Sequence, residues 1–325
     1  MTFLFTGIKI RKYLAHAMNV LFALLMLAVP ASTVNAAQNQ NYLGIIQVRG
    51  TKISTSSENL TYHNAQVMKT NETFAIFWIP PGYTVSPEYV NLINRYFSDV
   101  AAASGSTTNV YYSVTQYYDT ETGSPQFIQY SSTFGGFYVD TTPFYPNGCS
   151  DKYTTVCLSD AQIQSEVQKA IFMNNWPIQP TSAFFLLTPQ DVGSCADGLC
   201  TYSDYCGYHS WLITATSPIV YAHIPYAGWS ANHLTCDSGQ HPNGDVADAA
   251  INAISHLHNE MITDLQNSAW HDSADRQDGD KCVWNFGTGL GSTANGQYNQ
   301  LINGNPYYLQ QEWSNRSSKC VLQGQ

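Results

Sequence analysis

Short apolar runs separated by polar segments predict a series of buried strands along the chain. Residues 74–79, Phe-Ala-Ile-Phe-Trp-Ile, are continuously apolar and are closed by Pro-Pro-Gly, which is typical of a buried strand ending in a turn. Further strands are predicted at 110–114, 134–139, 183–187, 211–216 and 219–224. The apolar fragment 43–48 is a candidate edge strand.

Three helices are predicted between and after these strands. The first spans about 86–104, with Ser86 placed to accept free backbone N–H groups of its first turn. The second opens on a capping box formed by Ser159 and Gln162, and the third spans about 245–265. This order of elements predicts an α/β fold, with a layered mixed sheet, flanking helices and an irregular, disulfide-rich C-terminal part.

The first 36 residues have the pattern of a secretory signal peptide. Basic residues at 9–12 precede an apolar run from Val20 to Val29, and small residues follow up to Ala36. The run is roughly half of the ~20 residues that a membrane-spanning helix needs, so the alternative of an uncleaved anchor is disfavoured. We therefore expect cleavage after residue 36, and residues 37–325 to form one secreted, extracellular domain with no membrane span.

The eight cysteines all lie in the second half of the chain, and their even number in an exported protein favours disulfides over a zinc site. The pairing stays open at this point. Cys149–Cys157 and Cys282–Cys320 are the most natural local and C-terminal closures. Zinc is the alternative, but the spacing of Cys195, Cys200 and Cys206 is irregular for a zinc knuckle.

Composition and charge exclude a nucleic-acid partner. The chain has 13 Lys+Arg against 23 Asp+Glu, a formal net charge of -10, and a pI of about 5.2. Removal of the signal segment makes the charge three units more negative, because that segment carries three basic and no acidic residues. Binding to nucleic acid requires an excess of basic residues, which this chain lacks.

The third predicted helix carries the strongest candidate chemistry. His256, Glu260 and Asp264 follow one another at four-residue intervals, so they share one flank of the helix, and one ion could be held by His256 and Glu260 together. Two helical ligands with a third from a later loop is how zinc hydrolases hold their metal. Candidates for the third ligand lie in the segments 270–272 and 279–282, and Asp280 is favoured because a bridged Cys282 would fix it in place.

Zinc is therefore the expected cofactor, although other interpretations of this helix stay open. His256 and Glu260 can equally form an ion pair on the helix surface. A metal-binding helix after a partly parallel sheet matches the layout of zincin-type metalloproteases, whose general base is a Glu directly after the first His. Leu257 stands at that position here, and an aliphatic side chain cannot accept a proton. Any enzymatic activity is expected to be that of a metallopeptidase-like hydrolase.

Several segments resemble the secreted phosphate-induced, EXORDIUM-like proteins of plants and their microbial relatives. The resemblance covers roughly residues 74–320. Its most specific parts are Pro242-Asn-Gly-Asp245 and Cys206-Gly-Tyr-His209, and it extends to the Gly-Asp-Lys-Cys segment and to Tyr307–Asn315 at the end of the chain. The microbial branch commonly has a His-Glu pair in the helix, from which this chain departs at Leu257.

This resemblance implies an extracellular protein, linked in plants to growth signalling at the cell wall, and it makes His209 a candidate catalytic residue. The expected partners are an extracellular protein, a peptide or a cell-wall glycan. Two functions follow as hypotheses: a zincin-like protein that binds one divalent metal ion, and a non-enzymatic module that binds a glycan or receptor. Trp229 and Trp270 are the candidate sugar-stacking side chains of the second.

Overall fold

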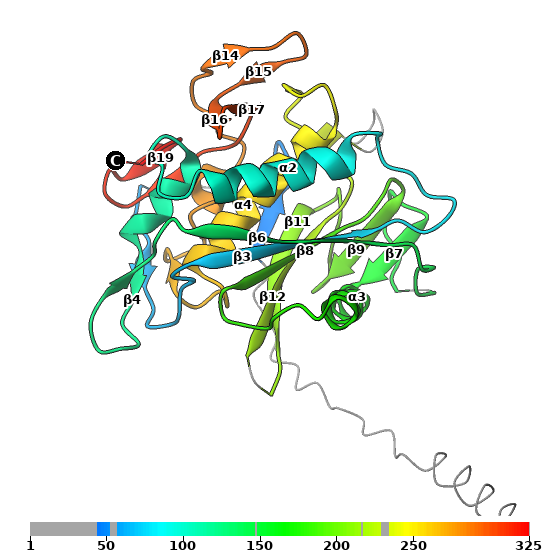
Figure 1. Cartoon of the computed structure of the whole chain (residues 1–325), viewed down its shortest axis with the longest axis horizontal. Coiled ribbons are helices and arrows are strands. Elements are labelled where there is room, and N and C mark those ends of the chain that lie inside the picture. Colours follow the sequence, from blue (N-terminus) through cyan, green and yellow to red (C-terminus); the bar gives the residue numbers. More distant parts are fainter. Residues whose placement is uncertain (1–43, 53–56, 147, 216, 229–233, 325) are drawn as a thin grey trace, which may run out of the picture. The chain divides into compact units, whose positions relative to one another are not determined.

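The computed structural model describes residues 44–52, 57–146, 148–215, 217–228 and 234–324 (Figure 1). The chain divides into two units, residues 1–40 and 41–325, and the fold below is that of the second unit. The predicted signal peptide and Trp229 lie outside the described residues.

A six-stranded mixed sheet forms the centre of this unit. Its strand order is β1-β11-β12-β8-β3-β6. The bounds are β1 Gly44–Gln47, β11 Tyr205–Ile213, β12 Pro218–Ile224, β8 Ser182–Leu187, β3 Asn71–Trp78 and β6 Ser132–Asp140. Strands β12, β8, β3 and β6 are parallel, whereas β11 runs antiparallel to both β12 and β1. The predicted mixed sheet is confirmed, and the candidate edge strand lies at its β1 edge.

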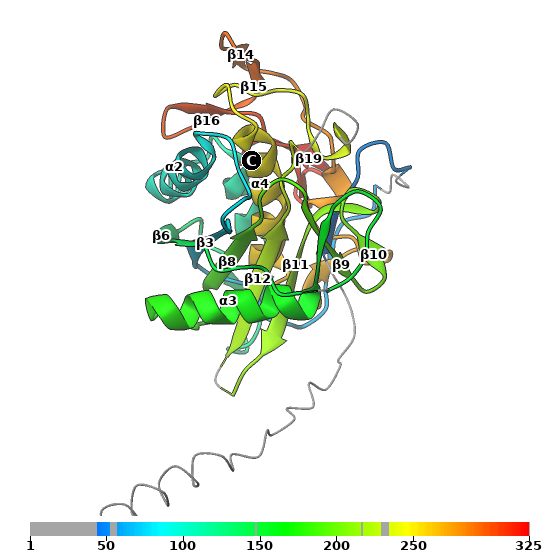
Figure 2. The ribbon, with the colours of Figure 1, turned by 90° about the vertical axis from the view of Figure 1, so that its right-hand side faces the viewer.

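Helices cover both faces of the sheet because its central strands are apolar on both sides. Phe77 and Phe185 pack in one core with α2 (Tyr89–Ala102) and α4 (Ala247–Thr263). On the same two strands, Phe74 and Phe184 stand an odd number of positions away and point to the other face, where they pack in the core with α3 (Asp160–Asn174). This alternation follows from the two-residue period of a strand. Figures 1 and 2 show α2 and α4 on one side of the sheet and α3 on the other.

Short strands and 3-10 helices make up the rest of the described chain. The pairs are β2 (Thr61–Tyr62) with β13 (Trp270–His271), β4 (Tyr118–Asp119) with β5 (Gln126–Phe127), β14 (Gly291–Ser292) with β15 (Gln297–Tyr298), β16 (Gln300–Ile302) with β17 (Asn305–Tyr307), and β18 (Glu312–Ser314) with β19 (Lys319–Val321). A separate three-stranded sheet has the order β10 (Leu199–Cys200), β9 (Val192–Ala196), β7 (Val156–Ser159). The 3-10 helices are η1 (Val110–Gln116), η2 (Leu234–Cys236) and η3 (Asp280–Cys282).

Three sequence-based predictions of these elements need correction. Residues 110–114 belong to η1 and not to a strand, because the side chain of Asn109 accepts the N–H of Tyr111 and caps a helical turn. The first helix begins at Tyr89, since the hydroxyl of Ser86 donates to Asp245 instead of capping. The strand predicted at 211–216 begins earlier, at Tyr205, and ends at Ile213.

Four disulfides join all eight cysteines. They are Cys149–Cys157, Cys195–Cys200, Cys206–Cys236 and Cys282–Cys320. The two predicted pairs are confirmed, and pairing of this kind is typical of proteins in oxidising environments. Within the described ranges, none of the helices has the length and apolar character needed to cross a bilayer.

Candidate metal centre

Helix α4 is buried along its whole length, and its flanks have different partners. Leu257 belongs to the apolar core, and its Cδ1 lies 3.3 Å from the position that a Cβ on Gly207 of β11 would take. His256 and Glu260 instead face the loop before η3, where a Cβ on Gly279 would lie 3.0 Å from both side chains. Glycine at position 279 therefore allows this loop to pass close to the polar flank of α4.

The ligand atoms of His256, Glu260 and Asp280 converge. His256 Nε2 lies 3.0 Å from Glu260 Oε1 and 4.0 Å from Asp280 Oδ1, and one ligand atom from each residue lies within 4.8 Å of the others. Ligands held at 2.0–2.2 Å from one zinc ion are separated by at most about 4.4 Å. The Nε2 atom has no hydrogen-bond partner of acceptable geometry among the described residues. These three residues could therefore hold a metal ion.

Backbone contacts and a disulfide fix Asp280 beside the helix. Its N–H donates to Glu260 Oε1 at 3.1 Å, and its Oδ2 accepts the N–H of Gln277 at 3.1 Å. Cys282, two residues later, is joined to Cys320. The disulfide of Cys282, which the sequence predicts to fix Asp280, is thus present. The loop is held by this disulfide after Asp280 and by the Gln277 N–H bond before it.

His209 reaches the same place from strand β11. It is fully buried, and its Nε2 lies 2.9 Å from Gln277 Oε1 and 3.6 Å from Glu260 Oε2. The edge strand β1 closes over this ring, since a Cβ on Gly44 would lie 2.0 Å from His209 Nε2. His209 therefore borders the group of three ligands without belonging to it, and it approaches Glu260 Oε2, whereas the N–H of Asp280 donates to Glu260 Oε1.

The other candidates on α4 lie elsewhere. Asp264 is buried at the end of the helix, where its Oδ1 accepts the N–H groups of Ser268 and Ala269, and it is not in the converging group. His258 occupies the far flank, as the helical geometry predicts, and contacts Tyr111 Oη and Asn71 Oδ1 at 3.0 Å each.

Two further buried carboxyl groups, those of Glu312 and Asp278, lie near the site. Neither was indicated by the sequence. Glu312 of β18 is fully buried, and neither of its carboxyl oxygens has a hydrogen-bond partner among the described residues. The Oδ1 atom of Asp278 accepts a hydrogen bond from Thr263 Oγ1. Its Oδ2 atom has no hydrogen-bond partner among the described residues. Nothing in the sequence spacing of either residue connects it to α4.

Burial strongly disfavours the charged forms of these groups. It raises the pKa of Asp278 to about 7 and that of Asp280 to about 8, and it raises the pKa of Glu260 and of Glu312 well above the usual range. Burial lowers the pKa of His209 to about 4. Several carboxyl groups and neutral imidazoles in one buried place form an environment that a divalent cation would stabilise.

A pocket of ≈ 300 Å³ connects the site to solvent. It is lined by Gly44, His63, Asp264, Asn267, Ser268, His271, Asp275, Gln277 and Asp280. The Asp280 side chain is 15% exposed, whereas those of His256 and Glu260 are 0% exposed, so Asp280 is the member of the group that faces the pocket. The volume is sufficient for a small molecule or one end of a chain.

Trp270 does not present a ring for sugar stacking. Its side chain lies in the core, in tilted or edge-on ring contacts with Tyr62, Tyr117 and Tyr118, and its Nε1 donates to the carbonyl oxygen of Tyr118. Among the described residues, this removes the tryptophan that the sequence offered as support for a glycan-binding module.

No protein-family model matches this chain, and no similar protein is found among the curated proteins or the solved structures. Fold and site define it as a disulfide-bonded mixed α/β protein with a buried His/Glu/Asp group that could hold a metal ion.

Proposed function

We propose that this chain is a secreted protein that binds one divalent metal ion, zinc, through His256, Glu260 and Asp280. The observation that carries the proposal is the convergence of one imidazole nitrogen and two carboxylate oxygens in a buried place. Zinc accepts this set of ligands, and three protein ligands leave one coordination position for water or a substrate. Secretion is supported by the signal-peptide pattern and by the four disulfides.

The arrangement supports a zincin-like relationship without supporting peptidase catalysis. A pair of ligands one turn apart on a helix beneath a mixed sheet, with a third from a later loop, is the zincin pattern, and it fits the microbial EXORDIUM-like branch. A bound zinc ion would supply a Lewis acid beside the pocket. Leu257 points into the core, however, so the position of the zincin general base offers no proton acceptor. The proposal is therefore metal binding by an extracellular protein whose partner is a protein, peptide or glycan.

Metal titration of the mature, chelator-treated protein tests this function. We expect one zinc ion per chain, and we expect Asp280→Asn to weaken binding by roughly tenfold or more, because it removes a charged ligand. Asp275→Asn is the matched control, since Asp275 lines the same pocket outside the ligand group. A wild-type protein that binds no zinc, or an Asp280→Asn variant with wild-type affinity, would refute the proposal.

The stability of the metal-free protein is expected to fall as pH rises from about 6.5 to 8.5. Asp278 and Asp280 have folded-state pKa values of about 7 and about 8, above their usual value of 3.8, so the folded state holds protons that the unfolded state releases. Their contribution is fully present below pH 3.8 and is lost as pH rises through the raised values. The lowered pKa values of the buried histidines act only below this window.

Calorimetry with and without zinc measures this dependence. Zinc is expected to raise the melting temperature more at pH 8.5 than at pH 6.5, because at the higher pH fewer protons compete for its ligands. Glu166 lies on α3, and burial raises its pKa to about 8, so it adds its own pH dependence to the stability. Measuring both pH values in a Glu166→Gln variant removes this contribution. Equal stabilisation by zinc at both pH values would contradict the expectation.

A further inference from the structure

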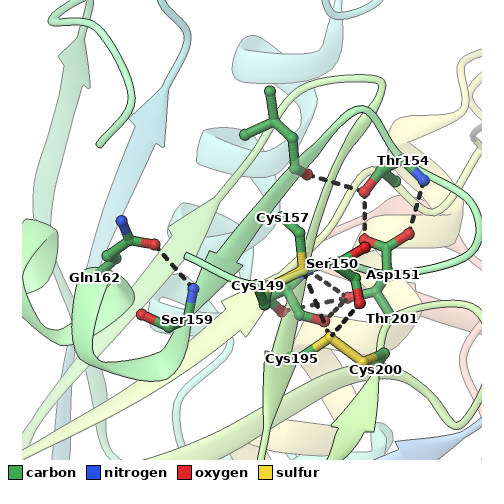
Figure 3. Close-up of a disulfide and its surroundings, with 12 residues drawn as sticks. Cys149, Ser150, Asp151, Thr154, Cys157, Ser159, Gln162, Cys195, Cys200 and Thr201 are labelled. Atoms are coloured by element: carbon green, nitrogen blue, oxygen red, sulfur yellow. Dashed lines mark hydrogen bonds between the residues drawn. A yellow bond between two sulfur atoms is a disulfide. The ribbon is translucent and has the colours of Figure 1, made fainter. Parts of the chain in front are cut away.

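Two of the four disulfides lie in direct contact with each other. The Sγ atoms of Cys157 and Cys195, which belong to different bridges, are 3.5 Å apart. The sulfur atoms of Cys149, Cys157 and Cys195 all lie within 4.8 Å of one another. Figure 3 shows the bridges Cys149–Cys157 and Cys195–Cys200 gathered into one cluster, which we call the sulfur cluster.

Regular backbone pairing holds the sulfur cluster in place. Strands β7 and β9 pair in parallel, with Cys157 opposite Gly193 and Ser159 opposite Cys195, and Cys195 in turn lies opposite Cys200 on β10. A Cβ on Gly193 would lie 2.8 Å from Asp151 Oδ2, so glycine at this position lets the Cys149–Cys157 loop approach β9. The short distance between the bridges thus results from strand register.

The loop between Cys149 and Cys157 has further support that does not depend on its disulfide. Asp151 accepts the backbone N–H groups of Tyr153 and Thr154 at 2.6 and 2.7 Å. It also accepts the hydroxyl of Thr154, and Figure 3 shows both bonds between Asp151 and Thr154. Cys149 also donates its N–H to the carbonyl oxygen of Cys157 at 3.1 Å. We therefore expect Cys157 to stay beside Cys195 after its own bridge is cut.

Exposure differs between the members of the sulfur cluster. Cys149, Cys195 and Cys200 are half-buried, whereas Cys157 is at the border of full burial at 9%. By contrast, the other two bridges have at least one deeply buried half-cystine each, with Cys206 at 1% and Cys282 at 2%. A thiol from solvent can therefore attack the outer sulfur of Cys149 more readily than the inner sulfur of Cys157.

We propose that the sulfur cluster is a thiol–disulfide exchange site that takes external thiols as substrates. An external thiolate attacks Cys149 Sγ, forms a mixed disulfide there and releases Cys157 as a thiolate. The Cys157 thiolate then attacks Cys195 Sγ, which breaks the Cys195–Cys200 bond, forms a Cys157–Cys195 bond and releases Cys200 as a thiolate that takes a proton from water. A second external thiol resolves the mixed disulfide, so that two thiols are oxidised to one disulfide.

Proximity favours the attack of the Cys157 thiolate on Cys195 over its reaction with a disulfide in solution. A thiolate held 3.5 Å from a disulfide sulfur reacts as an intramolecular nucleophile, which raises its effective concentration far above that of any thiol in solution. Both strands that carry the new bond are already paired, so the exchange requires little movement of the backbone. The product has one inner bridge and two outer thiols, at Cys149 and Cys200.

Partial reduction followed by disulfide mapping tests the proposal on the wild-type protein. The folded mature protein is treated with a limiting amount of reduced glutathione at neutral pH, quenched in acid, labelled with N-ethylmaleimide and digested at low pH for mass spectrometry. We expect a peptide pair joined through Cys157 and Cys195, with label or glutathione on Cys149 and label on Cys200. Label on both members of a native bridge, with no Cys157–Cys195 product, would overturn the proposal.

A pair of double variants provides an independent measurement. In Cys149→Ala/Cys200→Ala the two inner sulfurs have lost their partners. With oxidised glutathione present as the oxidant, we expect them to join and to release two reduced glutathione molecules, so that thiol titration of the folded, desalted protein finds no free thiol. Cys149→Ala/Cys157→Ala is the matched control, because it also removes two cysteines but retains a native bridge, Cys195–Cys200. Two free thiols in a folded Cys149→Ala/Cys200→Ala protein would be evidence against exchange between the bridges.

Discussion

Replacing His256 with alanine is expected to lower zinc affinity on the order of a hundredfold or more and to abolish the thermal stabilisation that zinc confers. The change removes the imidazole whose Nε2 lies 3.0 Å from Glu260 Oε1, and two carboxylates remain as the only members of the group. Competition with a chromophoric chelator measures the affinity, and melting temperatures with and without zinc measure the stabilisation.

His258→Gln is the matched control for this experiment. His258 lies on the same helix two residues away, is equally buried, and contacts Tyr111 and Asn71 on the opposite flank. Its replacement is expected to reduce stability through these lost contacts while leaving the affinity for zinc within about twofold of wild type. Equal losses of zinc affinity in both variants would show that the effect comes from helix packing and not from ligand removal.

Introducing the missing zincin base by Leu257→Glu is expected to destabilise the protein by several kcal/mol and to produce no peptidase activity. Leu257 has 0% exposure and lies in the core between α4 and the sheet, so the new carboxyl group would be buried without a partner. The lost apolar contacts add to this cost. Urea unfolding monitored by circular dichroism measures the change in the free energy of unfolding.

Leu257→Met separates the effect of charge from that of altered shape, because volume-conserving core substitutions usually cost below about 1.5 kcal/mol. A Leu257→Glu protein as stable as Leu257→Met, or one that cleaves a fluorogenic peptide, would mean that side chain 257 reaches the pocket. That result would contradict the orientation of α4 described above.

The helical part of the site could be predicted from the sequence because spacing within a helix fixes direction. His256 and Glu260 are one turn apart, and this places them on one flank and His258 on the other. Asp280 could be predicted as the third ligand because it stands two residues before Cys282, which was expected to form a disulfide. In these cases a local pattern was sufficient, because each prediction depended only on residues a few positions away in the sequence.

The parts of the site that come from distant segments could not be predicted in the same way. His209 meets Glu260 because β11 packs against α4, and the strand on which a helix packs has no signature in the apolar pattern of a single strand. Glu312 reaches the site through packing of the C-terminal segment. The Cys206–Cys236 bridge has a similar origin, because it joins β11 to a residue 30 positions later.

The segment at 110–114 shows a different limit of pattern-based prediction. Its tyrosines and valines favour a strand by composition, yet Asn109 and the hydroxyl of Ser113, which donates to the carbonyl oxygen of Val110, stabilise tight helical turns instead. Short apolar runs are ambiguous between helix and strand, and side-chain to backbone hydrogen bonds decided this one.

Anomalous X-ray diffraction from crystals of the mature protein grown with zinc tests the metal centre most directly. Data collected above and below the zinc absorption edge locate bound zinc without reference to a chosen ligand set. A single peak enclosed by His256 Nε2 and the carboxylates of Glu260 and Asp280 is the expected result. A protein with no anomalous peak between these three side chains, under conditions where zinc is in excess, would contradict the proposed metal site.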